Sequence, residues 1–443
     1  MMYRKTILGL MMIAGIAVVA APSAAATANK PNLVVILADD LGYQDVGFNG
    51  CKDIPTPHID SVAANGIKFT SAYVTYSVCA PSRAGFMTGR YPQRYGFERN
   101  PKHLPDDNTA GLALGETTLA DSLGKIGYKS AMIGKWHLGT HPDLHPVNRG
   151  FDECYNTPGR YFANSYAVNT RPGKKPQTCD KYRTDACSDE AVSFIERHKD
   201  ESFFLFLAYD APHMPLQATE KYLSRFPEIK NEKRKTYAAM VSAVDDGVGR
   251  VLEALRKLKL EDNTLVIFFS DNGGPEHKNA SNNGPLRGGK SDATEGGFRV
   301  PFALQWKGTL SAGVYDQPIS SMDIFATMSA LSHSPTDPNH PLDGVNLMPY
   351  LTGREKGAPH EAIYLRKFDQ GRFAVRKGDY KLLINGKGLD ANLYNLTEDI
   401  GEKTDLASQY PERLDELEKL RAAWASQLIE PVFEGSYISR KKK

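Results

Sequence analysis

Four short, largely apolar runs that each give way to a polar side chain constrain the fold of this 443-residue chain most. The runs cover residues 33–38, 130–133, 203–208 and 265–269, and the polar residues that follow them are Asp39, Lys135, Asp210 and Asp271. Runs of this length without a polar face are typical of parallel strands buried on both faces of a sheet. The sequence therefore predicts a buried parallel sheet with polar side chains at the ends of its strands.

Helical segments separate these strands. Residues 57–65, 118–126 and 235–258 suit helices, and the first of them begins with Thr56 as N-cap and Pro57 in the first turn. Strands that alternate with helices predict an α/β fold with a doubly wound, mostly parallel sheet. Ligands of such sheets bind beyond the carboxyl ends of the strands, which is where the four polar residues fall.

The pattern changes toward the C-terminus. Residues 362–365, 372–376 and 381–384 suit short strands, Lys377-Gly378-Asp379 suits a turn, and residues 411–428 suit a final helix. We therefore expect a main domain over residues 29–355 and a smaller C-terminal subdomain, antiparallel and α+β, over residues 356–443. Residues 155–188 are polar and lack periodicity, so we expect them to form a long loop over the ligand site.

The N-terminus has the pattern of a secretory signal. Arg4 and Lys5 precede an apolar run over residues 7–19 and a stretch of small residues over 20–28. The alternative is a buried N-terminal helix. A membrane span is excluded because the run is too short to cross a bilayer. We expect residues 1–28 to be removed and the chain to be periplasmic or secreted. Their removal takes two of the 54 basic residues and none of the 52 acidic ones, so the mature chain has no formal net charge. Nothing then directs it to nucleic acid or to membranes.

The chain has five cysteines, at positions 51, 79, 154, 179 and 187, and an odd count in an exported protein indicates one cysteine with a separate role. If Cys79 is set aside, the other four allow three disulfide connectivities, or none forms. Cys179 and Cys187 are close enough in sequence to close a short loop. The pairing stays open at this point.

Two acidic pairs follow separate predicted strands, Asp39-Asp40 and Asp271-Asn272. Each pair alone is common in a strand-end turn or at a helix N-terminus. Two such pairs at one edge of a sheet favour a shared metal ion. All four side chains offer oxygen ligands, which suit a hard divalent cation and argue against zinc. We expect one calcium ion, with magnesium as the second choice.

One segment resembles a known family closely. Residues 79–90, Cys-Ala-Pro-Ser-Arg-Ala-Gly-Phe-Met-Thr-Gly-Arg, resemble the signature of the type I, formylglycine-dependent sulfatases. A second signature matches at residues 127–130 and at Gly134-Lys135-Trp136-His137. Further matches follow in family order, at Asp39-Asp40, Ala211-Pro212-His213, Asp271-Asn272-Gly273 and residues 284–290. The resemblance extends from about Pro31 to the C-terminal subdomain, and implies an alkaline phosphatase-like fold with a catalytic main domain.

In this family the signature cysteine is oxidised to formylglycine. The resemblance therefore implies a formylglycine-generating enzyme, or an anaerobic sulfatase-maturing enzyme, as a partner of Cys79. It further implies that the aldehyde is hydrated to a diol beside the metal, and that one hydroxyl, activated by the metal and Asp271, attacks sulfur. After the alcohol has left, the second hydroxyl loses its proton to His137 and sulfate is expelled. Position 79 thereby joins Asp39, Asp40, Asp271 and Asn272 at the metal.

The resemblance also assigns the fixed charges. A sulfate monoester is an anion whose leaving oxygen gains charge, so its site needs cations and a proton donor. Arg83, on the same side of a helix as Cys79, would hold the diol near the metal. Lys135 and Lys290 would bind sulfate oxygens. His213 would protonate the leaving alcohol, helped by Lys290.

The sequence thus predicts a sulfatase, a sulfuric ester hydrolase that acts on a sulfated carbohydrate such as a polysaccharide or glycosaminoglycan. We expect sugar contacts from residues 155–188, with Arg160 and Asn164, and from residues 277–287; His103 is a further candidate. One alternative is a phosphatase or phosphodiesterase of the same superfamily, which would have two zinc ions and a Ser or Thr nucleophile. Another is a secreted binding protein without turnover. The sequence does not indicate the sugar, the sulfate position or the oligomeric state.

Overall fold

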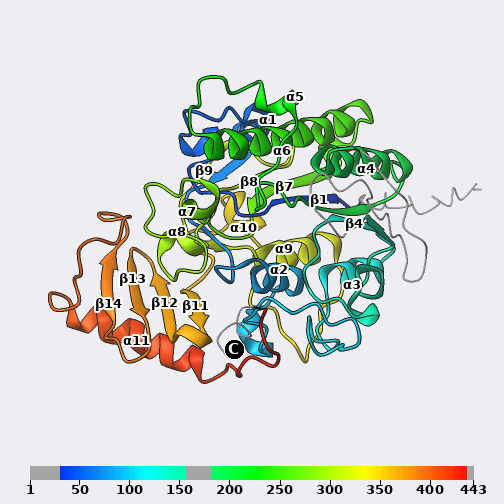
Figure 1. Ribbon diagram of the computed structural model, residues 1–443. Coiled ribbons are helices and arrows are strands. Elements are labelled where there is room, and N and C mark those ends of the chain that lie inside the picture. The colour runs from blue at the N-terminus through cyan, green and yellow to red at the C-terminus, as the bar shows by residue number, and fades with distance from the viewer. Residues whose placement is uncertain (1–29, 156–180, 437–443) are drawn as a thin grey trace, which may run out of the picture.

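The computed structural model describes residues 30–155 and 181–436 (Figure 1). The predicted signal peptide, Arg160, Asn164 and Cys179 lie outside the described residues, and so does the predicted pairing of Cys179 with Cys187. Within the described ranges, no helix combines the length and the apolar character that a membrane span requires.

The main domain is built on an eight-stranded sheet with the order β5-β4-β6-β1-β7-β8-β2-β9. All neighbouring strands run parallel except at β8, which is antiparallel to both β7 and β2. This confirms the predicted doubly wound, mostly parallel sheet, and the four predicted strands are its central members β4, β6, β1 and β7. The strands are β1 (Asn32–Ala38), β2 (Ile67–Phe69), β4 (Lys129–Gly134), β5 (Glu153–Tyr155), β6 (Phe203–Ala208), β7 (Thr264–Ser270), β8 (Phe302–Gln305) and β9 (Gly313–Tyr315). A separate pair joins β3 (Ala72–Tyr73) to β10 (Ile319–Ser320).

Helices cover both faces of the sheet, which explains the continuous apolar runs. Alternate residues of β1 pack into two different cores: Leu33, Val35 and Leu37 into one, and Val34 and Ile36 into the other. One face is covered by α1 (Pro57–Ala64), α4 (Arg183–Arg197) and α6 (Glu232–Lys257), and the other by α2 (Cys79–Thr88), α3 (Leu119–Gly124) and α9 (Asp323–Ser332). The shorter helices are α5 (Glu220–Leu223), α7 (Glu276–Asn279), α8 (Glu295–Phe298) and α10 (Met348–Leu351).

The N-terminus of α1 is stabilised differently from the prediction. Thr56 is the N-cap residue, but its side chain does not cap the helix; it accepts a hydrogen bond from the Gly47 N–H at 2.8 Å. The first turn is satisfied instead by Asp245 of α6, whose Oδ1 accepts from the N–H groups of His58 at 3.0 Å and Ile59 at 2.8 Å. A carboxylate from a neighbouring helix thus does the work of a local cap.

The predicted loop over residues 155–188 was wrong at both of its ends. Tyr155 is the last residue of β5, and residues 183–188 form the first turns of α4. The polar residues suggested an exposed loop, but Arg183 is buried and pairs with Asp210 at 2.8 Å. Ala186, on the next part of the same helix, packs into the core.

The C-terminal part is an antiparallel sheet, as predicted; it has four strands, and one helix lies across it (Figure 1). The fourth strand was missed, because its sequence Asn-Leu-Tyr-Asn is short and polar at both ends. Leu417 of the helix packs on Val375, Leu382 and Leu393 of the sheet. The elements are β11 (Ile363–Lys367), β12 (Arg372–Lys377), β13 (Tyr380–Asn385), β14 (Asn392–Asn395) and α11 (Pro411–Ala425).

A buried group of charges joins this subdomain to the main domain. Lys381 of β13 lies between Glu295 of α8, at 2.9 Å, and Glu402, at 2.8 Å, and all three side chains are fully buried. Arg299 also pairs with Glu295, at 3.2 Å. One set of buried ion pairs therefore connects the main domain to the C-terminal subdomain.

Candidate active site

The site lies beyond the carboxyl ends of β4, β6, β1 and β7. Asp39 and Asp40 follow β1, Asp271 and Asn272 follow β7, and the two strands are paired up to their last residues. The two acidic pairs therefore meet. The N–H of Asp40 donates to Asp271 Oδ1 at 3.3 Å, and Asn272 Nδ2 donates to Asp40 Oδ1 at 2.6 Å.

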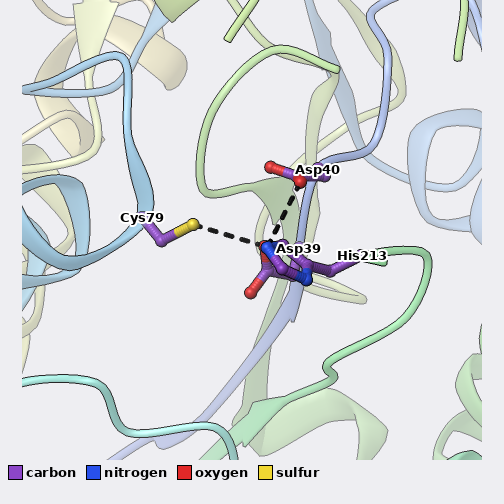
Figure 2. Close-up of side chains that lie close together, drawn as sticks. All are labelled: Asp39, Asp40, Cys79 and His213. Atoms are coloured by element: carbon purple, nitrogen blue, oxygen red, sulfur yellow. Dashed lines mark hydrogen bonds and ion pairs between the residues drawn. The ribbon is translucent and has the colours of Figure 1, made fainter. Parts of the chain in front are cut away.

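This cluster has the properties of a site for a hard cation. Asp39, Asp40, Asp271 and Asn272 are all at least 98% buried, and Asn272 Oδ1 has no hydrogen-bond partner among the described residues. Potential ligand atoms of Asp39, Asp40, Cys79 and His213 all lie within 4.8 Å of one another. Buried acidic oxygens with an unfilled acceptor beside them fit a divalent cation. Figure 2 shows that Cys79 and His213 lie on two different segments of the chain and that both point toward Asp39 and Asp40.

Three cationic side chains surround the cluster. Arg83, 1% exposed, donates to Asp39 at 3.0 Å, to Asp271 at 2.9 Å and to the Lys135 carbonyl at 2.5 Å. Lys135 Nζ pairs with Asp39. Lys290 Nζ lies 2.6 Å from Asp40 Oδ1 and 3.0 Å from Cys79 Sγ. Together they hold the pKa of Asp39 well below its usual range, although burial alone would raise it.

Cys79 is the first residue of α2 and is 1% exposed. Its Sγ lies 3.5 Å from Asp39 Oδ1. Burial, reinforced by the charge of Asp39, raises the pKa of the Cys79 thiol to about 12. An unmodified Cys79 is therefore a thiol at neutral pH, and it lacks the anionic form that a cysteine nucleophile uses.

The two histidines differ in their surroundings. His137 has a left-handed backbone, with φ of 67°, and its Nδ1 is buried without a hydrogen-bond partner among the described residues. Burial, and then the charge of Lys135, lowers its pKa well below the usual range, so the imidazole is neutral and able to accept a proton. His213 Nδ1 contacts the Met214 carbonyl at 2.6 Å, and its Nε2 lies 3.6 Å from Asp40 Oδ2.

A cavity of about 440 Å³ is lined by Lys290, the lysine that contacts Cys79 Sγ, and by Val78, which precedes Cys79. His277, which the sequence suggested as a substrate contact, lines this cavity, whereas His103 does not. Sequence reasoning missed the wall formed by residues 98–100 and by residues 367–370 of the subdomain, for which no motif or spacing gave a signal. Representative lining residues are Tyr76, Asn100, His277, Lys290, Lys367 and Gly435.

The far end of the described chain also supports this wall. The Ser436 N–H donates to the Asn100 carbonyl at 3.0 Å, and the side chain of Asn100 accepts from the N–H of Ala80 at 3.1 Å. Residues 435–436 are thus two hydrogen bonds away from the residue that follows Cys79. Cys79, the cavity wall and the subdomain form one structural unit.

The fold and this arrangement of side chains define a hydrolase of the alkaline phosphatase-like superfamily. The Sulfatase family model matches residues 31–334. Human N-acetylgalactosamine-6-sulfatase is 34% identical over 357 residues, which cover 72% of this chain and 66% of that relative. Human arylsulfatase A is 32% identical over 478 residues, 94% of this chain and 92% of that one. The chain belongs to the sulfatase family.

Solved structures agree with this assignment. The crystal structure of Ps i-CgsB is 38% identical, with a TM-score of 0.86, and the match covers 93% of this chain and 96% of that one. Ps i-CgsB has also been solved in complex with k-i-k-neocarrahexaose. The phosphonate monoester hydrolase of Agrobacterium radiobacter, at 22% identity and a TM-score of 0.67, shares the fold.

Proposed function

We propose that this protein hydrolyses a sulfate monoester of a sulfated carbohydrate, a polysaccharide or a glycosaminoglycan, and releases inorganic sulfate. The observation that carries the proposal is the position of Cys79, the signature cysteine, with Lys290 at 3.0 Å and the buried acidic cluster beside it. The names of the relatives support the choice of a saccharide. One is an N-acetylgalactosamine-6-sulfatase, and another similar protein has been solved with a carrageenan-type oligosaccharide.

Two groups would complete the site. A calcium ion, or less favourably magnesium, would be held by Asp39, Asp40, Asp271 and Asn272 with position 79, and would supply positive charge to the sulfate oxygens. Oxidation of Cys79 to formylglycine by a maturation enzyme would supply, in the hydrated form, the oxygen nucleophile. The raised pKa of the unmodified thiol is consistent with a need for this modification.

The remaining residues act on charge and on protons. Arg83, fixed by Asp39 and Asp271, orients the side chain at position 79 one turn before it in α2. Lys135 and Lys290, which pair with Asp39 and Asp40, bind the sulfate oxygens through their positive charge. His213 protonates the oxygen of the departing alcohol as its bond to sulfur breaks. His137, neutral because of its lowered pKa, takes up a proton from the side chain at position 79.

Two further parts of the prediction stand as proposals. The pattern of residues 1–28 favours export to the periplasm or secretion. The change of architecture near residue 356 favours a catalytic domain over residues 29–355 and a smaller subdomain over 356–443.

The test has two stages. Mass spectrometry of the tryptic peptide that contains position 79 must show the aldehyde instead of the thiol. The matured protein is then given an aryl sulfate, the matching aryl phosphate and a panel of defined sulfated oligosaccharides, with released sulfate or phosphate as the readout. We expect sulfate release from saccharides to dominate. Faster phosphate release would favour the phosphatase alternative, and no release from any ester would favour a binding protein.

A further inference from the structure

The cavity lined by Lys290 is also lined by a buried lysine that the mechanism does not use. Lys367 is the last residue of β11, in the C-terminal subdomain, and is 2% exposed. It lines the same cavity as Lys290, whose ammonium group contacts Cys79 Sγ. The cavity therefore contains both Lys367 and the lysine that contacts Cys79.

Lys367 forms no ion pair among the described residues, although Asp292, Glu98 and Asp369 act on its charge from a longer distance. Its Nζ donates to Ser77 Oγ at 3.2 Å and lies 4.9 Å from the centre of the Tyr76 ring. Over residues 30–155 and 181–436, no carboxylate lies within ion-pairing distance of it. An ammonium group has three N–H donors, so this one has donors to spare. Four other charged residues of the wall are in ion pairs, as Arg99–Asp369, Glu98–Arg366 and Asp292–Arg372, whereas Glu276 is exposed.

A buried cation without an ion-pair partner is unfavourable for the fold itself. Burial, and then the nearby charge of Arg372, lowers the pKa of Lys367 to about 8, although Asp292, Glu98 and Asp369 act in the opposite direction. The group is therefore still mainly charged at neutral pH. Lys278, at the rim of the cavity, has water around it and needs no partner. Buried charged residues without an ion-pair partner in the protein are concentrated at functional sites, where a ligand supplies the partner.

We propose that Lys367 binds an anionic oxygen group on the sugar next to the ester that is hydrolysed. The inference rests on the proposed function and narrows its substrate class: the preferred saccharide carries a second negative charge, a sulfate or a carboxylate. A cavity of about 440 Å³ has room for a substituted sugar ring between Lys290 and Lys367. The main domain thus carries out the chemistry, while the subdomain selects the substrate.

The experiment uses matched saccharides and matched variants of the full-length, matured protein. Each pair of saccharides shares one monosulfated sugar and differs only in a second sulfate, a carboxylate or neither. For each pair, kcat/KM is measured on the saccharide with two negative charges and on the one with a single negative charge. The ratio of the two values is then compared between wild type and Lys367→Met. We expect the ratio to fall by about 10- to 100-fold in Lys367→Met, as for loss of a hydrogen bond to a charged group. Lys367→Arg should keep most of this ratio. Lys307 is exposed, so Lys307→Met should leave the ratio unchanged.

Two readouts separate the possible failures. Because Lys367→Met removes a buried charge without an ion-pair partner, its melting temperature should equal or exceed that of wild type; a marked drop would assign the lysine to the fold. A ratio that is the same in wild type and Lys367→Met, with saccharides still hydrolysed, would overturn this inference and leave the proposed function intact. Hydrolysis of aryl sulfate but of no saccharide would overturn both. The sulfate and carboxylate pairs show which group Lys367 prefers.

Discussion

The buried ion pairs between the two parts of the molecule predict that Lys381→Met destabilises the fold strongly. The change keeps an unbranched side chain, one heavy atom shorter, and removes its charge. Lys381 lies between Glu295 and Glu402, at 2.9 and 2.8 Å, and none of the three side chains is exposed. Removal of one member of a buried ion pair costs about 3 to 5 kcal/mol, because the remaining charge stays buried without its partner.

The size of the loss in stability depends on the partners that Glu295 and Glu402 keep after Lys381 has been replaced. Glu295 keeps Arg299 at 3.2 Å and the hydroxyl of Tyr73 at 2.6 Å. Among the described residues, the carboxylate of Glu402 keeps one hydrogen bond, from the N–H of Glu295 at 2.8 Å. The loss therefore falls mainly on one carboxylate, and we expect the lower end, about 3 kcal/mol. This is a substantial part of the roughly 5 to 15 kcal/mol that stabilises a typical domain.

The chain offers a matched control. Lys377, in the neighbouring strand, also lies between two glutamates, Glu361 at 2.9 Å and Glu416 at 3.0 Å, but these side chains are 31 to 68% exposed. Lys377→Met should change the free energy of unfolding by less than about 1 kcal/mol. Unfolding in urea is followed by the fluorescence of Trp306 in the main domain and Trp424 in the subdomain. If the two variants lose the same free energy, the reasoning is refuted.

The same cluster predicts how the deficit depends on pH. Burial raises the pKa of Glu295, but Lys381 and Arg299 outweigh it, and the net value falls from 4.5 to about 2. Stability from a lowered carboxyl pKa is complete above the unfolded value and is lost as the pH falls toward the folded value. Burial raises the pKa of Glu402 above 4.5 even with Lys381 beside it, and Lys381→Met removes this stabilising charge, so Glu402 takes up a proton above pH 4.5 and before Glu295 does. The deficit of Lys381→Met should therefore be largest at neutral pH and should begin to shrink above pH 4.5 as the pH falls. A deficit that grows on acidification would contradict this assignment.

Three further predictions concern the site and the helix N-terminus described above. Cys79→Ala and Asp271→Ala should each lower sulfate release by at least about 1000-fold, and near-wild-type kcat in Cys79→Ala would rule out the nucleophile assignment. Chelation of divalent cations should lower both turnover and melting temperature, and calcium should restore both better than magnesium; indifference to chelation would argue against the metal. Burial raises the pKa of Asp245 to about 7 from 3.8, so its ionisation destabilises the fold as the pH rises. Asp245→Asn keeps the oxygen that accepts from His58 and Ile59, and should therefore raise the melting temperature more at pH 8 than at pH 5.

The sequence predicted the centre of the sheet better than its edges. Strands β1, β4, β6 and β7 are buried on both faces, and their apolar runs are visible without any structure. Strands β2, β5 and β9 have three residues each, and β9 is largely exposed, so they leave no pattern. Tertiary contacts, more than local preference, define these short strands.

The same contrast holds for the site. Residues that follow a central strand or lie in a signature, such as Asp39 and Lys135, could be predicted because their position is encoded locally. Lys367 could not be, because its hydrogen bond to Ser77 joins residues 290 positions apart. Asp245, which supports the N-terminus of α1 from another helix, was missed for the same reason.

The contribution of residues 435–436 to the cavity has a consequence for biosynthesis. The nucleophile position is made early during translation, whereas Gly435, which helps to close the wall, is added more than 350 residues later. A ribosome-bound intermediate therefore has the signature cysteine but not the complete enclosure around it. A chain that stops upstream of this segment therefore lacks part of the cavity wall, even where the main sheet has folded.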